Sequence, residues 1–227
     1  MKIILIPIFI FLHFHFAHSQ KSSFAIVSGL SFPNRYSPKI PEADYISKKN
    51  RKITFTPGFE FKYSFIKHLS LKTGVLYDER GWYANIFTLD PNTGAVETNV
   101  RTNFFYSFLT FPTVIESSFG NSFKINIGGG INNSLRVGGS TKADGKNVLS
   151  LDFLHPEVKS PHWDWSYVLE LGFGVKISKS LGLKIEGSYF KSLTPTGHYE
   201  PIEEEVFHKG YRILFGIERT IMSQPSK

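Results

Sequence analysis

The run from Ile53 to Phe65 alternates apolar and polar residues without a break, and it constrains the fold more than any other feature. Successive side chains of a β-strand point to opposite faces, so this run gives one apolar face and one polar face. The polar face carries Thr54, Thr56, Gly58, Glu60, Lys62 and Ser64. A strand of this length, aromatic on one face and charged on the other, is typical of a barrel strand that crosses a membrane.

The N-terminus predicts export from the cytoplasm. Met1-Lys2 is a short basic start, Ile3–Phe16 is largely apolar, and Ala17-His18-Ser19 places small residues before a cleavage site. This order is typical of a secretory signal peptide, so we expect a signal peptide over residues 1–19 and a barrel domain over residues 20–227. The apolar run is shorter than the ~20 residues that a spanning helix needs, which disfavours a helical anchor.

Composition narrows the chemistry and the partners. The chain has no cysteine, so it can form neither a disulfide nor a thiolate site, and no lipoprotein anchor is expected. Its formal net charge is +7, but the basic residues are scattered through alternating strands, so we do not expect nucleic acid as a partner. We expect outer-membrane lipid and lipopolysaccharide instead, because the basic segment Ser37–Lys52 can meet lipopolysaccharide phosphates.

Period-two patterning predicts about eight strands joined by connections of alternating length. The expected strands cover about 22–32, 53–65, 69–82, 102–117, 123–131, 165–177, 181–189 and 211–217. Tight turns are expected around 66–68, 119–122 and 178–180, and long polar loops over 33–52, 84–101, 137–162 and 193–209. Strict alternation of short and long connections is typical of bacterial outer-membrane barrels, so the fold class is all-β: a closed antiparallel up-and-down transmembrane barrel.

Aromatic residues gather by level along these strands. The end with the long connections holds Trp82, Trp163, Trp165, Tyr189 and Tyr211, and the opposite end holds Tyr63 and Phe65. Amphipathic rings prefer the two membrane interfaces, so this clustering predicts an aromatic girdle. On the same reasoning, the residues expected to face lipid include Phe59, Phe61, Leu169, Leu171, Ile185 and Ile213.

The chain resembles the PorT-like outer-membrane β-barrel proteins, small barrels typical of Bacteroidetes. Beside the signal peptide, the resemblance rests on Pro57-Gly58-Phe59, Phe111-Pro112, Gly128-Gly129-Gly130 and Tyr211–Ile217. It implies an integral outer-membrane barrel with an accessory role in secretion or envelope assembly, and secretion or envelope proteins as partners. Many such barrels end on an aromatic residue that the assembly machinery reads. This chain continues to Lys227 instead, so we expect an internal signal near Phe215.

The predicted inward face is rich in charges of both signs. Its members are Glu60, Lys62, Lys72, Asp78, Arg80, Glu116, Lys124, Glu170, Lys176, Lys184, Glu186, Arg212 and Glu218. Eight strands enclose a lumen that side chains can fill, and a buried charge without a partner is very costly. We therefore expect a salt-bridged plug, with room made by Gly58, Gly74, Gly128, Gly130, Gly172 and Gly174.

Three groups of residues could support chemistry, and each has a simpler explanation. Glu60, Glu116, Glu170 and Glu186 could act as acids and bases, but they also match the inward lysines and arginines. The last long loop offers possible cation ligands at His198, Glu203, Glu204, Glu205 and His208. The loop before it offers residues that some lipid-modifying barrel enzymes use: Asp144, Asp152, His155, Ser160, His162 and Asp164.

No hydrolase elbow, zinc pattern or phosphate loop is present in the sequence. We therefore expect a non-enzymatic outer-membrane protein with no catalytic, cofactor-binding or metal-binding residues, which acts structurally or docks partners through its long extracellular loops. The alternatives are a narrow pore for ions or small solutes, a lipid-modifying enzyme, and a soluble periplasmic barrel that resembles a lipocalin. The last alternative arises because a period of two does not say which face points inward.

Overall fold

The structure is a computed structural model that describes residues 21–36, 50–89, 96–143, 146–152, 163–195, 197–199 and 204–221. The predicted signal peptide lies outside these residues, so it stays a prediction. The strands are β1 (Lys21–Tyr36), β2 (Asn50–Arg51), β3 (Thr54–Ile66), β4 (Leu69–Leu89), β5 (Val96–Phe119), β6 (Phe123–Ala143), β7 (Lys146–Asp152), β8 (Trp163–Lys176), β9 (Leu181–Ser192), β10 (Gly197–Tyr199) and β11 (Glu204–Ile221).

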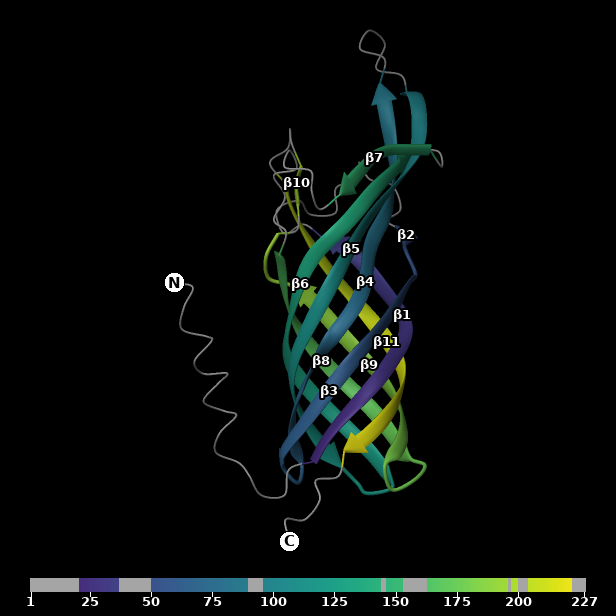
Figure 1. The fold of residues 1–227 in the computed structure, drawn as a ribbon. Helices are drawn as coiled ribbons and strands as arrows, with labels where there is room; N and C mark the ends of the chain where they lie inside the picture. The colour runs from purple at the N-terminus through teal and green to yellow at the C-terminus, as the bar shows by residue number, and fades with distance from the viewer. Residues whose placement is uncertain are drawn as a thin grey trace.

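Eight of these strands form a closed antiparallel barrel (Figure 1). Their order around the barrel is β1, β3, β4, β5, β6, β8, β9 and β11, and β11 pairs with β1 to close it. This closing pair runs from Ser22 opposite Ile221 to Tyr36 opposite Phe207. Closure leaves no strand edge of the barrel unpaired against lipid, which a membrane demands. The predicted fold class is confirmed.

The three predicted tight turns lie at one end of the barrel, which we call the short-turn end. Lys67 and His68 join β3 to β4, residues 120–122 join β5 to β6, and residues 177–180 join β8 to β9. Gly120 has a φ of 95°, a left-handed conformation that glycine adopts without the steric cost of a side chain. All three connections agree with the sequence-based prediction.

At the opposite end, which we call the hairpin end, β-strands extend into all four predicted loops (Figure 1). Strand β4 continues to Leu89 and pairs with β5 from Val96, so the expected loop 84–101 is wrong. Likewise, β7 pairs with the extension of β6, β10 pairs with β11, and β2 pairs with β4. Beyond the bilayer no lipid imposes an apolar face, so these strands lack the alternation that identified the others.

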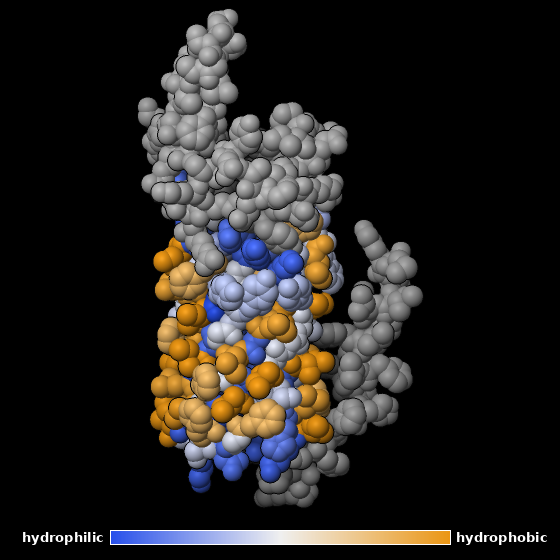
Figure 2. All heavy atoms as spheres, turned by 180° about the vertical axis from the view of Figure 1, so that it is seen from behind, coloured by the Kyte–Doolittle hydropathy of each residue, from blue (hydrophilic) through white to orange (hydrophobic). Residues whose placement is uncertain are grey.

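The outward face of the barrel is an apolar belt, visible in Figure 2 as mostly orange side chains below a band of blue and pale side chains. The six residues predicted to face lipid are all exposed, from 39% for Ile185 to 63% for Phe59. Among the described residues, no helix is long and apolar enough to cross a membrane. Since charged groups fill the lumen and apolar groups the outside, the lipocalin-like arrangement with an apolar interior is wrong.

The girdle prediction is confirmed at the hairpin end for the side chains that the structure describes. Trp163 and Trp165 are exposed at the start of β8. The Tyr189 ring lies 6.0 Å from Tyr167 and 5.2 Å from Tyr211, which forms an aromatic row across three strands. The side chain of Trp82 lies outside the described part of the chain. The row marks the level at which the apolar belt meets the interface.

Inside the barrel, charged residues form two layers with small and apolar residues between them. On β4, Gly74 and Leu76 separate Lys72 from Asp78. On β11, Leu214 and Gly216 likewise separate Arg212 from Glu218. Ala25, Val27, Leu76 and Leu214 form a buried apolar cluster in this middle region. On β4 and β11 the charged residues therefore fall into two separate networks.

Candidate functional site

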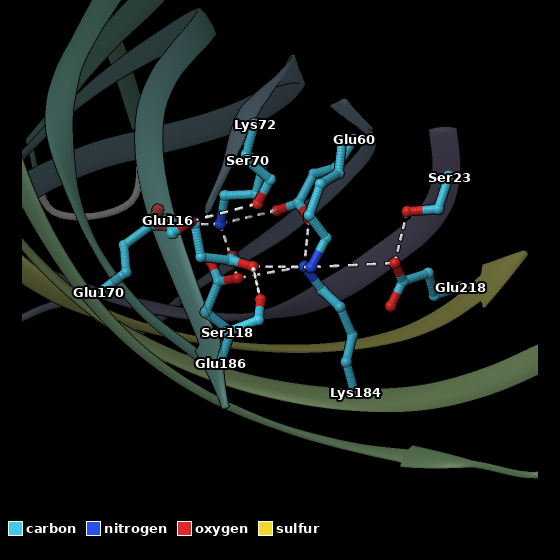
Figure 3. A network of polar contacts seen from close by, with 11 residues as sticks. Ser23, Glu60, Ser70, Lys72, Glu116, Ser118, Glu170, Lys184, Glu186 and Glu218 are labelled. Atoms are coloured by element: carbon cyan, nitrogen blue, oxygen red, sulfur yellow. Dashed lines mark hydrogen bonds and ion pairs between the residues drawn. The ribbon is translucent and has the colours of Figure 1, made fainter. Parts of the chain in front are cut away.

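The candidate site is the lumen, because it holds the buried titratable groups that the sequence predicted. The short-turn network comprises Ser23, Glu60, Lys62, Lys72, Glu116, Glu170, Lys184, Glu186 and Glu218 (Figure 3). The hairpin-end network comprises Asp78, Arg80, Thr110, Ser134, Asp164, Ser192 and Arg212. Strand alternation sends each of these side chains inward, and barrel closure brings strands that are distant in the sequence within reach of one another.

Lys72 is the centre of the short-turn network. It is 1% exposed, and its Nζ lies 2.5 Å from Glu170 Oε2 and 2.6 Å from Glu186 Oε2. Glu60 Oε1 is 3.9 Å from the same nitrogen. One ammonium on β4 therefore joins carboxylates of β8, β9 and β3 across the lumen, as Figure 3 shows. Buried charges are stable only when they are paired, and each carboxylate of this cluster lies within 4 Å of the Lys72 ammonium.

Lys184 and Lys62 complete the short-turn network. Lys184 donates to Glu60, and its Nζ lies 3.1 Å from Glu186 Oε2. Lys62 Nζ donates to Glu116 Oε1 at 2.7 Å and lies 3.9 Å from a Glu218 oxygen. The predicted pairing of the inward glutamates with lysines is confirmed.

One partner in this network was not predicted, and one detail of the inward-face prediction is wrong. The ion-pair partner of Glu170 is Lys72, which the pattern of alternation could not single out among the inward lysines. Lys176, which was expected inside, is exposed at the end of β8. Alternation predicts whether a side chain points inward or outward. The stagger of the strands decides which inward side chains meet across the lumen, and which inward-facing positions lie beyond the end of the lumen and are exposed.

Arg80 is the centre of the hairpin-end network and is fully buried. Its Nε donates to Asp78 Oδ2 at 2.9 Å, and its Nη1 donates to Asp164. Its Nη2 donates to Ser134 Oγ at 2.8 Å, and Arg212 Nη2 donates to the same Asp78 oxygen at 2.9 Å. The planar guanidinium suits such a site because it offers several fixed donors to two carboxylates.

Aromatic rings pack around this network and leave it little room for water. The Arg80 guanidinium carbon lies 4.5 Å from the centre of the Phe108 ring and 5.1 Å from that of Phe190. Both rings are at most 1% exposed. Arg80, Lys72, Phe108 and Phe190 are among the largest fully buried side chains of the described residues, and all four point into the lumen. A water-filled channel would instead leave side chains of this size accessible.

The structure separates residues that the sequence analysis had grouped in loops. Asp164, which was grouped with candidate loop nucleophiles and bases, begins β8 and is buried against Arg80. His208, which was grouped with loop acids, is 1% exposed in the lumen, with its ring 6.0 Å from Phe108. The other loop candidates lie outside the residues or side chains that the structure describes: Asp144, Asp152, His155, Ser160, His162, His198, Glu203, Glu204 and Glu205.

Glu116, Glu170 and Glu186 bring carboxylate oxygens within 4.8 Å of one another. Such oxygens are the ligands that a hard divalent cation prefers. However, the Lys72 ammonium lies within 2.6 Å of Glu170 and Glu186, so it already supplies the positive charge at this point. A metal ion would have to displace it. The cluster is therefore an internal ion-pair network, and its carboxylates are held by lysines rather than poised over an open cavity.

Comparison with known proteins decides the family. A family model described as outer membrane protein beta-barrel domain matches residues 16–197, which is most of the chain. The chain belongs to this outer-membrane β-barrel family. No curated protein matches the chain significantly. The family places the protein in the outer membrane, so the apolar belt is its lipid-facing surface.

Solved structures with a similar fold are also barrels of outer-membrane proteins. Ail of Yersinia pestis is 10% identical, with 89% of this chain and 99% of Ail covered and a TM-score of 0.42. Neisserial surface protein A is 11% identical, with 88% and 98% covered and a TM-score of 0.42. The outer membrane protease OmpT of Escherichia coli is 9% identical, with 91% and 98% covered and a TM-score of 0.47. These likenesses concern the fold alone.

Proposed function

We propose that this protein is a closed, non-conducting and non-enzymatic outer-membrane scaffold that docks partner proteins through its extended hairpins. The observation that carries the proposal is the filled lumen: two charged networks, centred on Lys72 and Arg80, span the barrel, and their carboxylates are ion-paired with lysines and arginines of the same networks. Groups committed to one another in this way are not free to line an ion path or to act as acids and bases on a substrate.

The hairpins supply the docking surface in this proposal. Strands β4, β5 and β6 extend beyond the barrel as paired β-structure, which gives a firmer platform than a loop of the same length (Figure 1). Binding residues often lie on connections that a rigid scaffold positions. The resemblance to PorT-like barrels suggests the kind of partner: a protein of a secretion system or of envelope assembly. In this proposal residues 1–19 act as the signal peptide that directs the export of the protein from the cytoplasm.

Single-channel recording tests the closed lumen. The purified folded protein, reconstituted into planar bilayers, should give no steady conductance, because Arg80, Lys72 and their partners block the lumen at two levels. As a control, the variant Arg80→Ala/Phe108→Ala removes two of the largest buried side chains in and around the hairpin-end network and should raise the frequency of channel openings. Reproducible, ion-selective steps of uniform size from the wild-type protein would contradict the proposal and establish the narrow pore.

Shortening the hairpins tests the docking role. Residues 86–100, 139–161 and 195–206 would each be replaced by a tight turn, which keeps Asp164 and His208 in the lumen. The barrel should still fold, as a heat-modifiable band on a gel would show, but it should not complement a deletion strain. Shortening the turn at residues 120–122 provides a matched control at the other end. Full complementation by the shortened barrel would place the function in the barrel wall or lumen.

A further inference from the structure

A cavity of about 330 Å³ opens on the outer surface of the barrel at the hairpin end. We call it the rim pocket, and the residues that line it are Glu79, Phe105, Ser107, Gly139, Ser140 and Lys142. Asp78 and Arg80 point into the lumen, so Glu79 between them points outward by alternation. The rim pocket therefore faces the surroundings of the barrel and belongs to neither lumen network.

The rim pocket lies directly above the apolar belt. Among the side chains of β4 that the structure describes, Tyr77 is the exposed belt residue nearest the hairpin end, and its hydroxyl lies 3.0 Å from Ser107 Oγ of the pocket. Across the lumen, Arg80, which neighbours Glu79, donates to Asp164, and Asp164 lies between Trp163 and Trp165 of the tryptophan girdle. Aromatic girdles lie at the headgroup level of a bilayer. Ser107, which contacts the Tyr77 hydroxyl, and Glu79 thus lie at the level of the lipid headgroups.

Positive charge is concentrated at the rim pocket. The Nζ atom of Lys52 lies 3.4 Å from the centre of the Phe105 ring, and that of Lys142 lies 5.8 Å from it. Glu79 Oε2 is 3.9 Å from Lys52 Nζ, and the Glu79 side chain is 38% exposed, so water weakens this pair. Burial lowers the pKa of Lys52, Glu79 opposes that shift, and Lys142 adds to it. Two ammonium groups beside one ring, against the single half-exposed carboxylate of Glu79, leave a net positive charge at the rim pocket that favours an anion.

We infer that the rim pocket binds a phosphate group of an outer-leaflet glycolipid, as in the lipid A part of lipopolysaccharide. Lys52 and Lys142 supply charge-assisted donors, Ser107 and Ser140 supply hydroxyls, and Phe105 supplies an apolar floor for the attached sugar. Outer-membrane barrels carry their longer connections on the extracellular side, where the outer leaflet meets the hairpin end. The inference goes beyond the docking role: it concerns lipid binding at Lys52 and Lys142, which point variants test with every hairpin left at full length.

The test is a comparison of two double variants with the same change of charge. Lys52→Gln/Lys142→Gln removes both ammonium groups of the rim pocket. Lys67→Gln/Lys179→Gln removes two exposed ammonium groups at the short-turn end. Each purified folded protein is titrated in detergent with diphosphorylated lipid A, with chemically dephosphorylated lipid A, and with inorganic phosphate, and bound lipid is counted by native mass spectrometry. A heat-modifiable band confirms the fold of each variant.

The expected result is that the wild type and the short-turn control bind diphosphorylated lipid A equally, while the rim-pocket variant binds it about tenfold more weakly. Dephosphorylated lipid A should bind all three proteins alike, and inorganic phosphate should not compete. If the double variant does not fold, the single Lys142→Gln variant must show the same loss of preference. Equal weakening in both double variants, or no weakening, would overturn the inference. Competition by inorganic phosphate at lipid concentrations would show a free-phosphate site instead.

Discussion

At the scale of single residues, Lys72 determines whether the short-turn network is stable. Lys72→Met keeps the length of the side chain but removes the ammonium that lies 2.5 Å from Glu170 and 2.6 Å from Glu186. Buried carboxylates would lose their counter-charge, so we expect a loss of about 3–5 kcal/mol in the free energy of unfolding. Urea unfolding in lipid vesicles, followed by tryptophan fluorescence, measures it. Lys67→Met in an exposed turn is the control, and a similar small change for both variants would contradict the argument.

At the scale of one element, strand β8 reports where the bilayer lies. Leu171 of β8 and Ile177, the residue after its end, are both apolar and exposed, with exposed fractions of 46% and 57%. Leu171 lies within the belt, whereas Ile177 follows the end of the strand at the short turn. Leu171→Arg should cost about 2–4 kcal/mol, and Ile177→Arg about 0–1 kcal/mol, because the cost of a charge falls towards the interface. Unfolding in vesicles measures both, and equal costs would show that β8 is not membrane-embedded over this range.

Elements also show how far the sequence can predict the fold. Every strand with one face towards lipid and the other towards the lumen was predictable. Lipid selects apolar residues and the lumen selects polar or small residues at alternate positions, which gives the sequence a period of two. The tight turn at Gly120 was predictable as well, since chain reversal there needs a residue that tolerates positive φ. The upper parts of β4 and β5, from Ala84 to Leu89 and from Val96 to Arg101, were not. Hydrogen bonds between the strands hold them there, and neither lipid nor core selects their side chains.

At the scale of the whole molecule, closure decides which charged residues meet. The sequence predicted that Glu170, Lys72 and Arg80 face the lumen as ion-pairing residues, but not that Glu170 reaches Lys72. It grouped Asp164 with loop residues and did not show that Asp164 reaches Arg80. These pairs join β8 to β4 across the lumen, so they depend on the number of strands and on their stagger. The rim pocket was missed for the same reason: it needs the β2–β3 connection to place Lys52 over Phe105 of β5.

Closure of the barrel can be tested with introduced cysteines, because the chain has none of its own. In the barrel, Ser28 of β1 lies opposite Phe215 of β11, although the two are far apart in the sequence. The variant Ser28→Cys/Phe215→Cys should therefore cross-link with a short bifunctional thiol reagent, because outward side chains of directly paired residues lie about 5 Å apart. A faster-migrating band on a denaturing, non-reducing gel would report the covalent loop.

The matched control is Ser28→Cys/Phe173→Cys, which places the second thiol on the outward face of β8, a strand not paired with β1. Both double variants carry one thiol at the same site on β1, so the reactivity of that thiol is common to them. Only the first pair should form the loop, and urea should abolish the difference by opening the barrel. Equal cross-linking of both pairs, or of neither, would mean that β1 and β11 do not close the sheet, and the charged lumen would then lack the enclosure on which its ion pairs depend.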